Sequence, residues 1–212
     1  MRTLQRVVRR AGLPVEYSKG FNPHMNVSIA QPLSVGMYSD GEYMDVMLTE
    51  EVDEQLINEK LNENAPTGIK FMGARKVEDT ADGKKVPQAM ALIDAAKYTV
   101  AIKYEDTSSL EEEIQKLLKQ DKWETLKKSK SGEKIVDIKE LVKDFRYNIN
   151  ENNLEIDCLV ACGSRANLSA DLLAQFIKAN TSNAKVDAFV DIKREELYVK
   201  KGRELVPIID FV

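Results

Sequence analysis

Histidine, cysteine and long apolar stretches are scarce in this sequence, and each scarcity excludes a class of protein. The 212 residues include one histidine, His24, and two cysteines, Cys158 and Cys162. These residues match no zinc-ligand spacing, so we expect no metal site. Two cysteines are too few for a disulfide framework, and their spacing along a predicted strand holds them too far apart to bridge. We therefore expect reduced thiols.

No apolar run approaches the roughly 20 residues that a membrane-spanning helix needs. The first residues also lack the apolar core of a signal peptide. We therefore expect a cytoplasmic protein without a membrane partner. The proportions of hydrophobic residues (43%) and charged residues (31%) are ordinary for a soluble globular protein, and the length suits one large or two small domains.

The net charge of −4 does not indicate a nucleic-acid-binding protein, but basic residues are concentrated near the N-terminus. Leu4, Val7, Val8 and Ala11 follow a helical period and predict an amphipathic helix over residues 1–11, closed by Gly12. The opposite face of this helix carries arginines at positions 2, 6 and 9. Such a stripe can contact RNA phosphates.

The sequence predicts an α+β fold of two halves, residues 1–76 and 91–212, joined by a linker at 77–90. For the first half we predict an extended segment at 13–17, strands at 27–29 and 42–48, a helix ending before Pro66 that buries Val52, Leu56, Ile57 and Leu61, and a strand at 69–74. For the second half we predict strands at 98–104, 123–128, 145–149, 154–161 and within 186–199, with helices at 108–120 and 171–179. Both orders approximate a ferredoxin-like, split βαβ unit with an antiparallel sheet.

Residues 9–43 gather polar side chains between helix-breaking residues. The Asn-Pro junction and Gly20 predict a loop over residues 18–24 that contains His24. That histidine could be a general acid or base, a phosphate contact or a metal ligand, or it could stabilise the loop through hydrogen bonds. The stretch resembles the signature of the radical-SAM-linked family through Arg10, Gly12, Leu13, Tyr17, Ser18, Gly20, Phe21, Asn22, Pro23, His24, Pro32, Leu33, Gly36, Ser39 and Glu42.

The radical-SAM-linked family is a bacterial domain of unknown function found beside or fused to B12-type radical SAM proteins and ribonuclease E/G. Its members carry a further strand upstream, so the resemblance implies that the first half lacks its N-terminal strand. It also implies that a radical SAM protein, RNA and ribonuclease E/G are partners. The chain itself has only two cysteines where a radical SAM cluster needs three, so we expect no iron–sulfur cluster and no other cofactor.

A second block, residues 163–167, also resembles the family. A glycine turn that leads to a helix can bind phosphate through backbone N–H groups. Alternatively, the block is an ordinary strand-to-helix connection with Ser169 as the N-cap. Taken together, the candidate RNA- or ligand-binding residues are Arg6, Arg9, Arg10, Tyr17, Ser18, Asn22, His24, Ser39, Gly163, Ser164 and Asn167.

Three functions are compatible with these patterns. The first is a non-catalytic RNA-binding or substrate-presenting partner of a radical SAM protein in RNA modification or processing. The second is an enzyme in which His24 is the acid–base residue of a pocket with Tyr17 and Glu42. The third is a protein-interaction module, which would expose an apolar patch instead of a ligand site.

Overall fold

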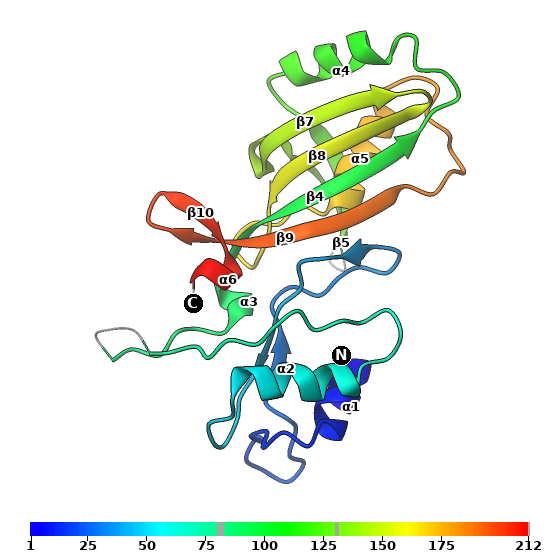
Figure 1. The fold of residues 1–212 in the computed structure, drawn as a ribbon. Helices are drawn as coiled ribbons and strands as arrows, with labels where there is room; N and C mark the ends of the chain where they lie inside the picture. The colour runs from blue at the N-terminus through cyan, green and yellow to red at the C-terminus, as the bar shows by residue number, and fades with distance from the viewer. Residues whose placement is uncertain (80–82, 130–131, 212) are drawn as a thin grey trace. The chain divides into compact units, whose positions relative to one another are not determined.

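The computed structural model describes residues 1–79, 83–129 and 132–211 (Figure 1). Contacts between Cα atoms divide the chain into two compact units. The first unit comprises residues 1–30, 43–91 and 209–212, and the second comprises residues 31–42 and 92–208. The chain therefore leaves the first unit within the signature stretch and returns to it twelve residues later. No helix in the described part of the chain is long and apolar enough to cross a membrane.

The core of the first unit is built from the two longer helices of that unit and a short antiparallel strand pair. Its elements are α1 (Arg2–Arg10), β1 (Val27–Ile29), β3 (Met44–Val46) and α2 (Glu54–Glu63). β1 pairs with β3 so that Val27 lies opposite Val46. One apolar cluster joins these elements and consists of Val7, Val8, Ala11, Leu13, Val15, Met25 and Leu61. The two predicted strands and the N-terminal helix are thus confirmed.

The helix α2 starts where its sequence supplies a cap. The side chain of Asp53 accepts a hydrogen bond from the backbone N–H of Leu56 at 3.0 Å, which satisfies one of the free donors at the helix N-terminus. The prediction that Leu56 is buried was wrong, because this residue is 42% exposed. Leu61, at the other end of the helix, is buried in the core as expected.

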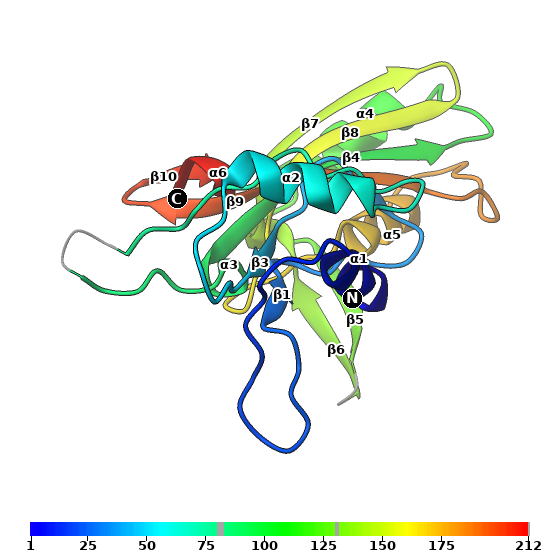
Figure 2. The ribbon, with the colours of Figure 1, turned by 60° about the horizontal axis from the view of Figure 1, so that its bottom comes forward.

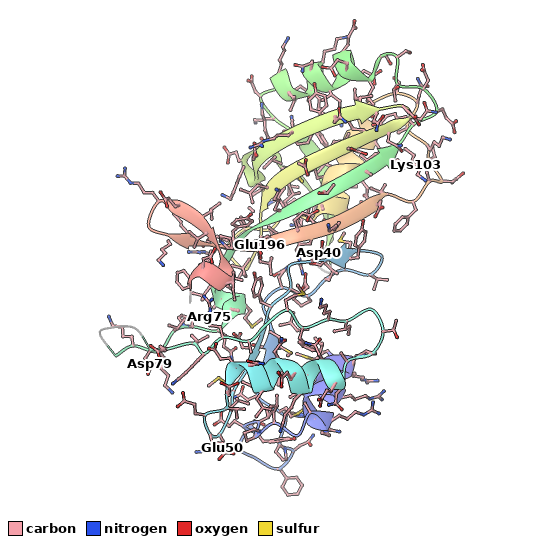
Figure 3. The ribbon with its side chains drawn as sticks, in the orientation of Figure 1. Asp40, Glu50, Arg75, Asp79, Lys103 and Glu196 are labelled. Atoms are coloured by element: carbon pink, nitrogen blue, oxygen red, sulfur yellow. The ribbon has the colours of Figure 1, made fainter. Side chains whose placement is uncertain are left out.

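The strand predicted at residues 69–74 is absent from the structure, which describes this segment as irregular. The side chain of Asn62 explains why. Its amide nitrogen donates to the carbonyl oxygen of Phe71 at 2.8 Å, and its amide oxygen accepts from the N–H of Phe71 at 2.9 Å. A helix side chain therefore satisfies backbone groups that would otherwise need a neighbouring strand. Further along the chain, the guanidinium of Arg75, which is labelled in Figure 3, donates to the carbonyl oxygen of Ile209 at 2.9 Å.

The predicted linker at 77–90 falls partly outside the described residues. Residues 77–79 and 83–88 form neither helix nor strand, and residues 80–82 are not described. The short helix α3 (Ala89–Leu92) begins before the predicted linker ends. At the other end of the chain, α6 (Ile208–Phe211) follows the last strand.

The second unit contains a sheet with the strand order β10-β9-β4-β8-β7, visible in Figure 1 as the green to red strands. Its neighbouring strands are antiparallel. The short strand β2 pairs with β9 in parallel. The bounds are β2 (Tyr38–Ser39), β4 (Ile93–Lys103), β7 (Val142–Asn150), β8 (Asn153–Ala161), β9 (Asp191–Lys201) and β10 (Glu204–Pro207).

Two helices and an aromatic group complete the second unit. The helices are α4 (Leu110–Lys119) and α5 (Ala170–Ala179). A separate hairpin is formed by β5 (Glu124–Ser129) and β6 (Gly132–Asp137). A short 3-10 helix, η1 (Lys139–Leu141), precedes β7. The buried indole of Trp123 stacks on Phe176 of α5 at 5.5 Å and meets Phe145 of β7 edge-on at 5.9 Å. These rings pack a helix against the sheet, and the mixed α+β class is confirmed.

Candidate functional site

The signature loop, residues 18–24, is closed at its base by backbone hydrogen bonds. Tyr17 and Met25 form an antiparallel bridge, and the N–H of Ser18 donates to the carbonyl oxygen of His24 at 2.8 Å. In return, the N–H of His24 donates to the Ser18 hydroxyl oxygen at 3.0 Å. Gly20 has a φ of +130°, which side-chain-bearing residues rarely adopt. Figure 2 shows the blue segment between α1 and β1 as a long projection.

The loop exposes its side chains instead of burying them. Phe21 is 109% exposed and Tyr17 is 48% exposed, whereas Met25 is buried. Lys19, Asn22 and His24 are also exposed. The hydrogen bonds that close the loop use the backbone of His24 and the hydroxyl group of Ser18, so the imidazole is not the group that holds the loop. Phe21 belongs to the family signature but was not among the residues predicted to bind RNA or a ligand, although an aromatic residue between Gly20 and Asn22 was a visible signal.

The arginines of α1 lie on the exposed face of that helix. Val7 and Val8 are buried in the core, whereas Arg6, Arg9 and Arg10 are exposed. Arg6 and Arg10 also line a cavity of about 430 Å³ together with Thr3, Val7 and residues 63–66 at the C-terminal end of α2. Cationic side chains near a helix C-terminus are favoured by the helix dipole, so this arrangement also has a structural use.

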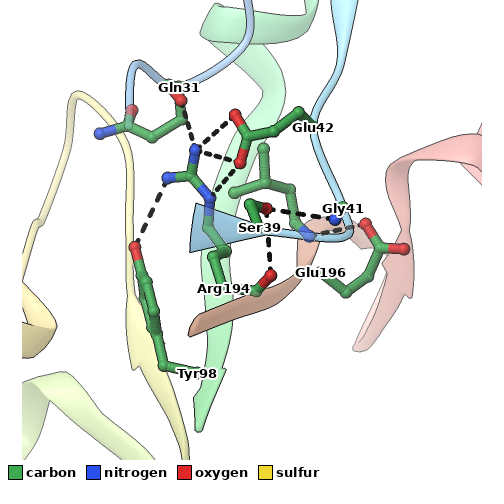
Figure 4. Close-up of polar contacts among 8 residues, drawn as sticks. Gln31, Ser39, Gly41, Glu42, Tyr98, Arg194 and Glu196 are labelled. Carbon is green, nitrogen blue, oxygen red and sulfur yellow. Dashed lines mark hydrogen bonds and ion pairs between the residues drawn. The ribbon is translucent and has the colours of Figure 1, made fainter. Parts of the chain in front are cut away.

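Glu42 belongs to a different constellation, in the second unit (Figure 4). Its carboxylate accepts two hydrogen bonds from Arg194 of β9, from Nε at 2.7 Å and from Nη2 at 2.6 Å. Arg194 is 1% exposed, and it also donates to the carbonyl oxygen of Gln31 at 2.6 Å. The guanidinium further approaches the hydroxyl of Tyr98 at 3.5 Å. Glu42 therefore neutralises a buried cation.

The pKa of Arg194 reflects two opposing effects. Burial by itself lowers the pKa, but the hydrogen bonds and negative charge of Glu42, together with Tyr98, raise it by more. The net result is a pKa above the ordinary value, so the guanidinium stays charged. Sequence reasoning missed Arg194. Period-two alternation from Ile192 would have placed it on the buried face of β9.

Ser39 fastens the same segment to β9. Its hydroxyl donates to the carbonyl oxygen of Arg194 at 3.0 Å and accepts from the N–H of Gly41 at 3.1 Å. A Cβ at Gly41 would lie 2.4 Å from the carbonyl oxygen of Glu195, so only glycine permits this approach. Asp40, which is labelled in Figure 3, lies next to them and pairs with Lys193 at 2.6 Å. Ser39 and Glu42 thus attach the second half of the signature to β9. The convergence of His24, Tyr17 and Glu42 in one pocket stays a prediction.

The second block forms the connection from β8 to α5. Ser164 and Asn167 are exposed, and the Ser169 hydroxyl accepts from the N–H of Leu172 at 3.2 Å, which confirms Ser169 as the N-cap. Gly163 has a φ of +122°, and a Cβ there would lie 2.2 Å from the carbonyl oxygen of Ile93. Gly163 is therefore required by the close passage of two backbone segments. Phosphate binding by its backbone stays a prediction.

Both cysteines of the chain lie in the second unit. Cys158 and Cys162 are both free and buried. Burial, with the nearby charges of Asp157 and Asp144, raises the pKa of the Cys158 thiol to about 12. Within the described ranges, no group of three or more histidine, cysteine, aspartate or glutamate side chains is arranged to hold a metal ion.

A comparison with protein families shows which family the chain belongs to. Residues 1–170 match the family described as an uncharacterized protein conserved in bacteria (DUF2344), and because this match covers most of the chain, the protein belongs to that family. Comparisons with curated proteins and with solved structures gave no match. The family description gives no reaction, so the function must be inferred from the geometry described above.

Proposed function

We propose that this protein is a cytoplasmic, non-catalytic RNA-binding partner that presents RNA to a radical SAM protein, with ribonuclease E/G as a further partner. The observation that carries the RNA-binding part is the exposure of Phe21 at 109% in a loop whose base is fixed by hydrogen bonds. An aromatic ring fully in water adds no packing energy to its own fold. It is, however, available to stack on an unpaired base.

The neighbours of Phe21 suit the same ligand. Tyr17 offers a second, half-exposed ring, and Lys19 offers a cation for phosphate. Asn22 and His24 present hydrogen-bonding groups that can contact base edges. The arginines of α1 precede this loop in the same unit and supply further cations for phosphate. The radical SAM partner rests on the family resemblance of residues 10–42.

The test is fluorescence anisotropy of a labelled single-stranded RNA of about 12 nucleotides with the full chain, because single-strand sites span roughly 4–16 nucleotides. Phe21→Ala should weaken binding by about fivefold to a hundredfold, the equivalent of one stacked base. Phe189→Ala is the matched control, since this ring is 67% exposed but lies in the second unit. Its affinity should equal that of the wild type.

Replacing Arg2, Arg6 and Arg9 together by alanine should lower the slope of log affinity against log salt by about 2, since each phosphate contact with a single strand contributes roughly 0.7.

His24→Ala should weaken RNA binding without lowering the melting temperature, because the imidazole is exposed. Absence of saturable RNA binding, or an unchanged affinity in Phe21→Ala, would reject the proposal. If Phe21→Ala instead abolished only the capture of the radical SAM protein, the protein-interaction function would replace it.

We also infer that the second unit has a ferredoxin-like arrangement. The chain order β4-α4-β7-β8-α5-β9 and the spatial order β9-β4-β8-β7, all antiparallel, support it. The β5–β6 hairpin is then an insertion between α4 and β7. An experimental structure with a different strand order would overturn this inference.

A further inference from the structure

A cavity of about 330 Å³ in the second unit gathers cationic side chains at one end of the sheet. Its lining includes Lys143, Arg165, Lys200 and Arg203, and the lining residues contribute a single carboxylate, that of Asp94. Four cations against one carboxylate leave a formal surplus of three positive charges. This surplus occurs in a chain whose net charge is −4, so the charge is locally concentrated.

The sheet itself places these residues together. Both β4 and β7 are irregular at this end, because the pairing register shifts around Asp94 in β4 and around Lys143 in β7. An extra residue in a strand redirects its side chain, and such bulges are common beside functional sites. Lys200 lies near the end of β9, and Arg203 lies in the turn between β9 and β10. Arg165 follows Gly163, whose close approach to Ile93 fixes the turn.

Asp94 acts as an anchor within the cavity. One carboxylate oxygen accepts a hydrogen bond from Arg165, and the other accepts from the backbone N–H of Lys200 at 2.9 Å. The Asp94 side chain is 17% exposed, so most of its charge faces these donors and not the open space. Among the described residues, no carboxylate forms an ion pair with the side chains of Lys143, Lys200 or Arg203.

Cys162 also lines the cavity but adds no negative charge. Burial raises the pKa of its thiol above the ordinary value, although the charge of Arg194 acts in the opposite direction. The thiol is therefore neutral at pH 7. Three cations from separate elements thus converge on one space without an anionic partner of their own.

We propose that this cavity is a binding site for a phosphate monoester. Such a group carries a charge of about −1.5 to −2 at neutral pH and has three strong acceptor oxygens. These oxygens match three cations that approach from β7, β9 and the β9–β10 turn. Arg165, which donates a hydrogen bond to Asp94, supplies a fourth donor side chain. The site goes beyond the RNA-binding loop, because it belongs to the second unit and shares no residue with that loop.

The first experiment is a calorimetric titration of the full chain with inorganic phosphate at low salt. We expect saturable binding of one phosphate per chain, weakened at least about tenfold by the double substitution Lys200→Ala and Arg203→Ala, because each charge-assisted contact contributes about this factor. The matched control is Lys116→Ala with Lys119→Ala, which removes the same charge from the exposed face of α4. Its affinity should equal that of the wild type.

Salt and pH provide independent readouts. Binding should weaken as salt rises, because it depends on charge, and it should tighten from pH 5 to pH 7.5 as phosphate takes up its second negative charge near pH 6 to 7. Lys200 and Arg203 are exposed, so circular dichroism should show both double variants folded. Phosphate binding that is absent in the wild type, or equal in the Lys200/Arg203 variant and the wild type, would overturn the proposal.

A competition experiment distinguishes the sources of the phosphate group. Displacement of inorganic phosphate by adenosine 5′-monophosphate alone would assign the site to a small phosphate ester. Displacement by a 5′-phosphorylated RNA, but not by the same RNA with a 5′-hydroxyl group, would assign it to an RNA end. Displacement by neither would overturn the proposal of a monoester site. The Phe21→Ala variant should bind inorganic phosphate as the wild type does, so failure of the loop hypothesis leaves this test intact.

Discussion

At the scale of single residues, Arg194 is the charged side chain most deeply buried in the described part of the chain. A buried charge is tolerated only when a partner and hydrogen bonds compensate for lost water. Glu42, Gln31 and Tyr98 provide these contacts. The pair therefore constrains the second half of the signature to one place on β9.

Glu42→Gln should lower the free energy of unfolding by about 3 kcal/mol, because it leaves the guanidinium of Arg194 buried without a counter-charge. Adding Arg194→Met should recover part of this loss, since the second change removes the uncompensated charge. Asp40→Asn is the control, because the Asp40 side chain is exposed and its ion pair with the partly buried Lys193 should contribute less than about 1 kcal/mol. Urea unfolding measures all three. A Glu42→Gln variant as stable as the wild type would contradict a structural role for the pair.

Cys158 makes stability depend on pH in the alkaline range. Its folded-state pKa, about 12, lies above an ordinary value near 9, so the folded protein retains a proton that the unfolded chain loses. This contribution is fully present below pH 9 and is lost as the pH rises from 9 towards 12. Between pH 8 and pH 10 the free energy of unfolding should fall by about 1.4 kcal/mol more in the wild type than in Cys158→Val. Equal slopes in urea titrations would contradict the burial of this thiol.

At the scale of elements, local chemistry explains which predictions succeeded. The caps Asp53 and Ser169 and the hairpin from β7 to β8 are encoded by neighbouring residues, so the sequence predicted the helices and strands there. The strand at 69–74 failed because Asn62 satisfies the backbone of Phe71, a contact that no local pattern reveals. β2 was missed because it is two residues long and pairs with a strand remote in sequence.

The sequence also predicted only those parts of the candidate site that depend on neighbouring residues. Gly20 and Pro23 predict the loop over residues 18–24. The polar side chains of this loop are exposed in the structure, as expected for a surface loop. The partner of Glu42 could not be predicted, because ion pairs across 152 residues depend on the tertiary fold. The cavity of the second unit was likewise hidden, since its cations come from separate strands and turns.

Two glycines of the second unit allow a test of the β8–α5 connection. Gly163→Ala should lower the free energy of unfolding by at least about 2 kcal/mol, because its Cβ would clash with the Ile93 carbonyl oxygen in addition to the left-handed backbone strain. Gly202→Ala also has a positive φ, +65°, but no atom lies within 4 Å of the added carbon. It should cost only about 1 kcal/mol. Chemical denaturation of both variants would show whether the two losses differ, and equal losses would contradict the close approach at Gly163.

At the scale of the whole molecule, the family match and the folded unit have different limits. The match ends at residue 170, whereas β9 lies at 191–201 and pairs with β4 along most of its length. A chain cut after residue 170 would lose β9 and α5, and with them the ring of Phe176 that stacks on Trp123.

We therefore expect residues 1–170 alone not to form the second unit. The fluorescence of Trp123, the single tryptophan, should shift to the red because its indole becomes exposed to water. A chain ending at Ile208 is the control and should keep the emission of the full protein, since it retains β9 and α5. Native-like emission from residues 1–170 would show that the shorter chain folds without β9.

The pairing of β2 with β9 also sets an order of events during synthesis. Glu42 leaves the ribosome 152 residues before Arg194, a delay of roughly 8 to 30 s at typical elongation rates. Throughout this interval Arg194, the partner of Glu42, has not yet been made, and neither have the residues of β9 with which Tyr38 and Ser39 pair. Residues 31–42 are thus made well before β9 and can reach their folded position only after β9 has been made.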